Sequence, residues 1–96
     1  MARKFLVHAR RDQVGVAVAD ILKGEEVEGT FMDDGSKVTV KSQDEVPLGH
    51  KIALMEIGKG QKVIEYGEEI GVATAGIPKG SHVHVHNIKS MRWGSS

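Results

Sequence analysis

Apolar and polar residues alternate along most of this chain, and a period of two is typical of β-strands. In residues 37–41, for example, Val38 and Val40 would point inward between polar neighbours. No segment keeps an apolar period of 3.6 residues over several turns, so amphipathic helices are not expected. The sequence therefore predicts an all-β fold. The expected strands are residues 4–9, 14–19, 25–32, 37–41, 52–55, 63–66, 70–74 and 81–88.

Short turns separate these strands. Residues 33–36 read Asp-Asp-Gly-Ser, and Asp-Gly favours a hairpin with a type I′ turn, in which both central residues have positive φ. Residues 20–24 predict one helical turn, which Asp20 would cap and Gly24 would end. A further turn is expected at residues 67–69.

A seven-residue pattern, Ile-x-Lys-Gly-x-x-Val, begins at Ile21, Ile57 and Ile77. The uneven spacing of the copies excludes a solenoid. We interpret the pattern as a repeated corner, in which Ile anchors the turn in the core, Lys-Gly reverses the chain, and Val starts the next strand. This predicts a compact domain with short helical turns at its corners.

Length and charge limit the possible functions. The 96 residues suit a single domain, residues 1–93, with Gly-Ser-Ser at 94–96 as an appended tail. Thirteen basic and 13 acidic residues give zero net charge, which argues against binding nucleic acid or a membrane surface through bulk charge. The absence of Cys excludes disulfides and thiolate ligands and favours a cytoplasmic protein. Exposed strand edges and a lone Trp are features that a homodimer could cover, so a homodimer is a further expectation.

The chemistry is concentrated in the last expected strand, where His82, His84 and His86 occupy alternate positions. In an extended strand the three imidazoles would share one face, with two valines on the other. Because His82 and His86 would lie roughly 13 Å apart, one ion could take at most two neighbouring histidines unless the strand bends. The alternative is a polar strand face whose histidines alternate by chance. The alternation of three histidines favours a functional surface.

Four segments carry a resemblance to a known family. They read Leu-Gly-His-Lys-Ile-Ala-Leu at 48–54, Val-Ile-Glu-Tyr-Gly at 63–67, Ile-Gly-Val-Ala-Thr at 70–74, and Gly-Ser-His-Val-His-Val-His-Asn at 80–87. In this order they resemble the N-terminal SAF domain of the altronate and galactarate dehydratase family, from about residue 5 to residue 87. The resemblance implies a β-clip fold.

The same resemblance implies a lyase that removes water from a sugar acid with divalent iron (Fe2+) or a similar metal, which would be shared with a large subunit. In that family the larger part of the enzyme follows the SAF domain or is a separate polypeptide. We therefore expect a separately encoded small subunit, or an excised domain, that is inactive without its large catalytic subunit. Residues 89–93 are also similar to the small subunit of sulfolactate sulfo-lyase, which eliminates sulfite. A non-catalytic module that binds carbohydrate or metal is the alternative of another class.

Elimination from a hydroxy acid requires a held carboxylate, a base and a stabilised leaving group. His50 is the expected catalytic residue, since it could move protons, and Lys51 is the expected cation for the substrate carboxylate. His84, His86 and Asn87 are expected to bind substrate, and the metal candidates are His82, His84 and His86. These roles require that His50 and the histidine segment converge on one surface.

Overall fold

The computed structural model describes residues 1–90; the predicted tail at 94–96 and most of the segment 89–93 lie outside the described residues. Within residues 1–90 every regular element is a strand, so the all-β, SAF-like fold class is confirmed. The described part of the chain holds no helix of a length and hydropathy that would cross a membrane. The strands are β1 (Ala2–Val7), β2 (Val14–Ala17), β3 (Glu26–Phe31), β4 (Lys37–Lys41), β5 (Lys51–Ala53), β6 (Lys62–Glu65), β7 (Glu68–Ala73), β8 (His82–Val83) and β9 (Ile88–Ser90).

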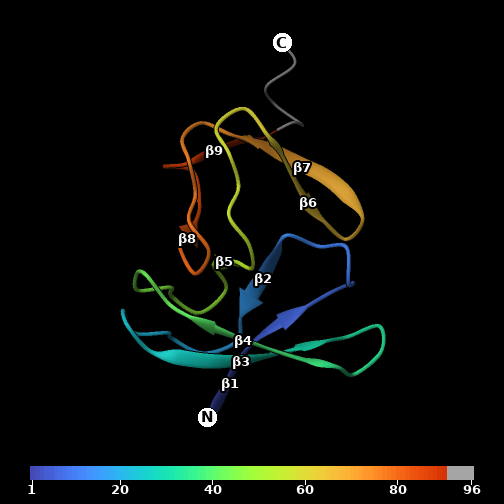
Figure 1. Ribbon diagram of the computed structural model, residues 1–96, viewed down its shortest axis with the longest axis vertical. Coiled ribbons are helices and arrows are strands. Elements are labelled where there is room, and N and C mark those ends of the chain that lie inside the picture. The colour runs from blue at the N-terminus through green and yellow to red at the C-terminus, as the bar shows by residue number, and fades with distance from the viewer. Residues whose placement is uncertain (91–96) are drawn as a thin grey trace.

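The strands form two sheets. The larger has the order β4-β3-β1-β2-β5-β8, and the smaller has the order β6-β7-β9. Only β1 and β3 pair in parallel; the other strand pairs are antiparallel. In Figure 1 the small sheet lies at the top, β1, β3 and β4 cross at the bottom, and β2 and β5 lie between them.

Two hydrophobic cores lie on opposite faces of the β2–β5 layer. Ile52 belongs to one core and its neighbour Ala53 to the other, because successive side chains of a strand point to opposite faces. The two central strands therefore contribute to both cores. The first core contains Phe5, Val7, Ala17, Ile21, Val27, Val40, Val46, Ile52 and Leu54. The second contains Val14, Ala53, Ile57, Val63, Ala73, Ile77 and Val83.

Phe5 fills the first core by lying over two glycines on the neighbouring strands. A Cβ atom at Gly29 would come within 2.0 Å of the Phe5 ring, and one at Gly15 within 2.7 Å. Such distances are excluded by van der Waals repulsion. The Phe5 ring therefore fits here only because both positions are glycine.

The repeated corner is a β-turn, and the predicted helical turn at residues 20–24 is wrong. Gly24 has φ of 83°, and the N–H of Glu25 donates to the carbonyl of Leu22 at 3.1 Å, as in a type II turn. Ile21 forms a β-bridge to Val46 instead of starting a helix. The Gly24 N–H donates to another strand segment, so no helical hydrogen bond forms there.

The structure contains a fourth corner that the Ile-x-Lys-Gly-x-x-Val pattern does not include. It begins at Val46, and Gly49 at its turn has φ of 86°. The four corners are joined in pairs by β-bridges, Ile21 with Val46 and Ile57 with Ile77. The pattern does not match here because Val46, Leu48 and Ile52 stand where it has Ile, Lys and Val.

The β3–β4 hairpin is confirmed, but its type I′ turn is wrong. Only Gly35 has positive φ in that loop, and its N–H donates to Phe31 at 2.8 Å. The two-residue loop with positive φ at both positions is Tyr66–Gly67, between β6 and β7, with φ of 60° and 71°. Asp12 supports this turn, as both backbone N–H groups donate to its carboxylate.

Candidate functional site

His50 and His82 meet across the pairing of β5 with β8. The type II turn at Gly49 delivers His50 directly before β5, and Ile52 in β5 pairs with His82 in β8. Since residues two apart on a strand share a face, His50 and His82 lie on the same side. Their Nδ1 and Nε2 atoms are 2.8 Å apart, a hydrogen bond between imidazoles. The predicted convergence of His50 with the histidine segment is confirmed.

The histidine segment is not an extended strand, so the predicted alternation over residues 81–88 is wrong. β8 ends at Val83, and the chain then turns, with the N–H groups of Asn87 and Ile88 both donating to the His84 carbonyl at 3.0 Å. Val85 consequently does not point inward and is 80% exposed. Short-range hydrogen bonds of the turn replace the ladder that an extended strand would need.

Asn87 stabilises this turn with its side chain. Its Oδ1 accepts from the His84 N–H at 3.0 Å, and its Nδ2 donates to the His82 carbonyl at 2.8 Å. With 9% exposure, the side chain is nearly enclosed by the loop that it supports. Its polar atoms already bind backbone, and its predicted role in binding substrate stays a prediction.

The turn brings His84 back over His50. Their ring centroids are 4.3 Å apart, and the ring of His82 lies 5.6 Å from that of His84. One ring nitrogen from each of these three histidines falls within 4.8 Å of the others. The ring of His86 lies 5.1 Å from that of His82, but His86 does not belong to this group. The rings that lie together are thus those of His50, His82 and His84, and the metal role of the predicted His82, His84 and His86 stays a prediction.

We define the histidine cluster as His50, His82 and His84, and the pKa values of two of its members are lowered. The pKa of His82 is lowered, first by loss of hydration and then by the charge of His50. The pKa of His84 is lowered by the same two causes. Neutral imidazole presents the lone pair that accepts a proton or binds a cation.

Lys51, the first residue of β5, makes a contact outside the histidine cluster. Its Nζ lies 3.7 Å from Oε1 of Glu65, which comes from the small sheet. Burial raises the pKa of Glu65, and the Lys51 charge only partly offsets this. Because the Lys51 side chain is 31% exposed and its contact with Glu65 is long, the ammonium stays accessible to an anion.

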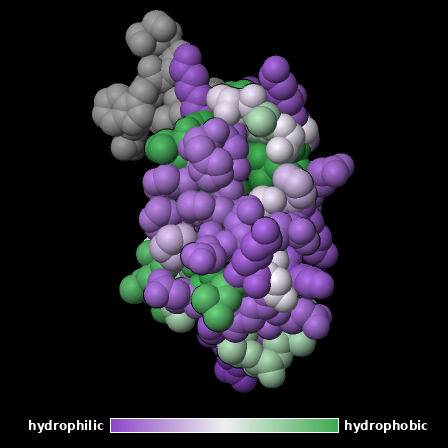
Figure 2. Space-filling view, turned by 90° about the vertical axis from the view of Figure 1, so that its left-hand side faces the viewer, coloured by the Kyte–Doolittle hydropathy of each residue, from purple (hydrophilic) through white to green (hydrophobic). Residues whose placement is uncertain are grey.

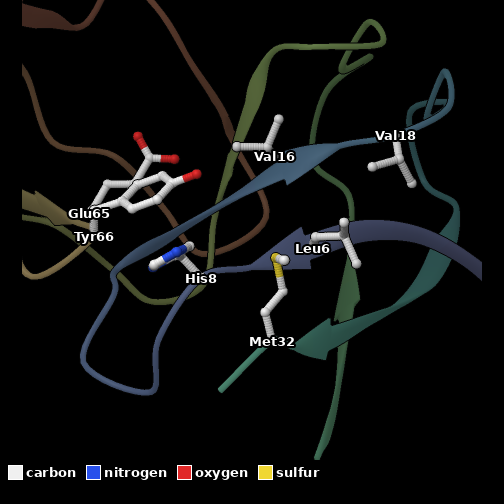
Figure 3. A pocket seen from close by; sticks show the side chains of 7 residues that line it. All are labelled: Leu6, His8, Val16, Val18, Met32, Glu65 and Tyr66. Carbon is white, nitrogen blue, oxygen red and sulfur yellow. The ribbon is translucent and has the colours of Figure 1, made fainter. Parts of the chain in front are cut away.

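A pocket of about 310 Å3 lies beside this ion pair (Figure 3). Glu65, Tyr66 and His8 gather at one end, and Leu6, Val16, Val18 and Met32 line the rest. The rings of His8 and Tyr66 stack with centroids 3.5 Å apart. The side of the molecule that faces left in Figure 1 is predominantly hydrophilic, with small, separated apolar patches (Figure 2).

Two contributors to the site were absent from the sequence-based prediction. Asp44 accepts the backbone N–H of His82 at 3.0 Å, and Glu65 pairs with Lys51. A looser corner pattern, apolar-x-x-Gly, would have revealed the fourth corner and placed His50 and Ser81 at equivalent positions, each directly after the corner glycine. No local signal marks Asp44 or Glu65.

The fold and the histidine cluster define an all-β domain whose chemistry lies at one sheet edge. The family described as altronate/galactarate dehydratase SAF domain matches residues 3–91. The chain therefore belongs to this SAF-domain family.

Individual relatives are lyases and dehydratases by name. The chain is 37% identical over 94 residues to subunit alpha of (2R)-sulfolactate sulfo-lyase from Chromohalobacter salexigens, covering 97% of this chain and 100% of that protein. It is 40% identical over 60 residues to the same subunit from Paracoccus pantotrophus, covering 62% and 90%. It is 45% identical over 84 residues to altronate dehydratase from Escherichia coli, covering 88% of this chain but 16% of that enzyme.

Proposed function

We propose that this chain is the small subunit of a lyase that acts on a hydroxy acid, and that its histidine cluster forms part of an active site completed by a larger polypeptide. The observation that carries the proposal is the convergence of His50, His82 and His84 on one surface in a chain of this family. A lone SAF domain offers these imidazoles from one side only. The larger polypeptide would enclose the substrate from the other.

Sulfite elimination from (2R)-sulfolactate is the first reaction to test, because the alignment with that subunit alpha covers 100% of the relative. In such an elimination a base removes the proton from the carbon that bears the hydroxyl group. The carbon–sulfur bond breaks, and sulfite leaves with the bonding electrons. The resulting enol becomes a keto acid when its carbon is protonated.

Dehydration of altronate or galactarate is the second candidate, supported by the family match and by the 45% identity to altronate dehydratase. The departing group is then hydroxide, which needs a proton as it leaves. A non-catalytic module for carbohydrate or metal is the competing class. It is expected to bind its ligand without any turnover in the assays described below.

The proposed roles follow from the local chemistry. His50 moves a proton, since the Nε2 atom of His82 lies 2.8 Å from its Nδ1 atom. Lys51 attracts the substrate carboxylate by exchanging its long contact with Glu65 for a closer one. His84 and His86 are exposed and can bind hydroxyl groups. A divalent metal, Fe2+ by the resemblance, would polarise a hydroxyl or carboxylate oxygen. A cytoplasmic location and a homodimer stay predictions.

The test pairs this chain with its cognate large polypeptide and measures sulfite release from (2R)-sulfolactate, then dehydration of altronate and galactarate. His50→Ala and His84→Ala should each lower kcat/KM by about 100-fold or more, the usual contribution of a positioned acid–base group. His8→Ala is the matched control, since His8 stacks on Tyr66 outside the histidine cluster. Turnover that survives both cluster substitutions would refute the roles, and rapid turnover by the isolated chain would refute the subunit proposal.

A further inference from the structure

We propose that the histidine cluster is a three-histidine site for one divalent transition-metal ion, with at least one coordination position open to solvent. This goes beyond the proposed function and does not need it, because the site rests on residues of this chain alone. It also replaces the ligand set expected from the sequence, since His50 takes the place of His86.

The spacing of the nitrogen atoms fits a metal ion. One nitrogen from each histidine lies within 4.8 Å of the other two, and the His50–His82 pair is at 2.8 Å. Metal–nitrogen bonds of 2.0–2.1 Å in tetrahedral geometry place the nitrogens about 3.3 Å apart. Binding would therefore lengthen the distance between the His50 and His82 nitrogens slightly and bring the His84 ring closer to them. His84 is exposed, so its ring can move without disturbing a core.

The rings have few competing partners. Among residues 1–90, the only hydrogen bond that joins these three rings to another group is the one between His50 and His82. Within the same described range no ion pair joins a carboxylate to these rings, because the nearby Asp44 carboxylate accepts the backbone N–H of His82. A bound cation would instead take up the lone pairs of all three rings.

The backbone that carries the ligands is held in place before any ion binds. The β5–β8 pairing fixes His50 opposite His82. Asp44 holds the backbone N–H of His82, and Asn87 holds the backbone of both His82 and His84. Rigid support of this kind lowers the conformational cost of binding.

The donor set indicates the class of metal. Imidazole favours Zn2+, Fe2+, Ni2+, Co2+ and Cu2+, whereas Mg2+ and Ca2+ favour oxygen ligands. Three protein ligands with an open position are typical of catalytic sites, where water or a substrate oxygen completes the coordination. The open position here would accept a hydroxyl or carboxylate oxygen.

The test titrates the full untagged chain with Zn2+ and, under anaerobic conditions, Fe2+ by calorimetry, and with Co2+ by visible absorption. We expect one ion per chain and no binding of Mg2+. His50→Ala, His82→Ala or His84→Ala should each weaken binding by more than the roughly 10- to 100-fold that loss of an outer-shell partner costs. Thermal unfolding without metal checks each variant, and the corresponding Gln variant replaces any that fails to fold.

His86→Ala is the matched control, because His86 lies in the same segment but outside the cluster. It should bind the ion as tightly as the wild-type chain. Absence of binding by the wild-type chain would overturn the proposal, and so would an equal loss in His86→Ala. The assay needs neither substrate nor partner. Metal binding without lyase activity would therefore overturn only the proposed function, and activity without binding only the metal site.

Discussion

At the scale of single residues, the properties of a side chain in this protein depend on its contacts with residues from other strands. His50 and His82 are 32 positions apart, yet their rings share a hydrogen bond. Lys51 and Glu65 come from different sheets and form an ion pair. In each pair the pKa of one member is shifted, mainly by loss of hydration: the pKa of His82 is lowered and that of Glu65 is raised.

Glu65 gives a pH prediction at this scale. Its pKa is raised above the ordinary 4.5 by burial, which means that the folded chain holds this proton more tightly than the unfolded chain. The stabilising contribution of the protonated form is complete below pH 4.5 and is lost as the pH rises through the raised pKa of the folded state. Glu65→Gln, which carries no titratable proton, should therefore be more stable than wild type at pH 7.

The measurement is the free energy of unfolding in urea across pH 4 to 8. The advantage of Glu65→Gln over wild type should shrink as the pH falls. Glu68→Gln, exposed in the same hairpin, is the control and should show no such trend. A constant difference between Glu65→Gln and wild type at every pH would contradict this account.

At the scale of elements, turns determine where the strands begin and what they present. The four type II corners place a glycine of positive φ before a strand, and one of them delivers His50. The turn after β8 folds the histidine segment back on itself. The type I′ turn at Tyr66–Gly67 is unusual, since Tyr66 is a non-glycine residue at φ of 60° and gains support from Asp12.

Asp12 gives the prediction at the scale of elements. Its carboxylate is 2% exposed and accepts N–H groups from Ala9, Tyr66 and Gly67. Asp12→Ala leaves these donors without their partner and should lower the free energy of unfolding by about 3 kcal/mol, since each buried unsatisfied group costs on the order of 1–3 kcal/mol. Asp12→Asn retains an acceptor oxygen and should fall between wild type and Asp12→Ala. Urea denaturation measures both variants. A loss below about 0.5 kcal/mol for Asp12→Ala would show that the turn does not depend on this carboxylate.

At the scale of the whole molecule, two cores share one central layer. β2 and β5 send side chains into both cores, so neither core can open without exposing these strands. The histidine cluster lies at the β8 edge of the same layer. The site therefore adjoins the layer that both cores share, and the exposed His84 leaves it accessible to an ion, substrate or partner.

This arrangement predicts one cooperative unfolding transition. The amide of Ala17, bonded to His50 O, and that of Ala53, bonded to Ser81 O, should exchange with solvent only through global unfolding. The Gly35 amide, in an exposed hairpin loop, should exchange much faster. Hydrogen exchange followed by NMR at increasing denaturant tests this. If the amides of the small sheet exchanged with a lower opening free energy as a separate group, the two cores would be independent.

The local pattern of the sequence was enough to predict much of this fold. Alternation of apolar and polar residues predicted the strands because burial on one face requires it, and Val40 is buried as expected. The resemblance carried jointly by residues 48–54, 63–67, 70–74 and 80–87 predicted the family. The corner repeat was recognised as a chain reversal, but its helical form was wrong because the Ile that begins it pairs with a distant segment.

The sequence by itself determined that this is an all-β domain rich in tight turns, with imidazoles near its end and a basic pair near its middle. Only the tertiary structure decided which imidazoles meet. His86 was expected in the metal set because alternation puts it on the same strand face as His82 and His84. The turn closed by Asn87 breaks that alternation, and the β5–β8 register places His50 beside His82. The reason is physical: hydrogen bonds between segments far apart in sequence fix the register, and a local pattern contains no information about them.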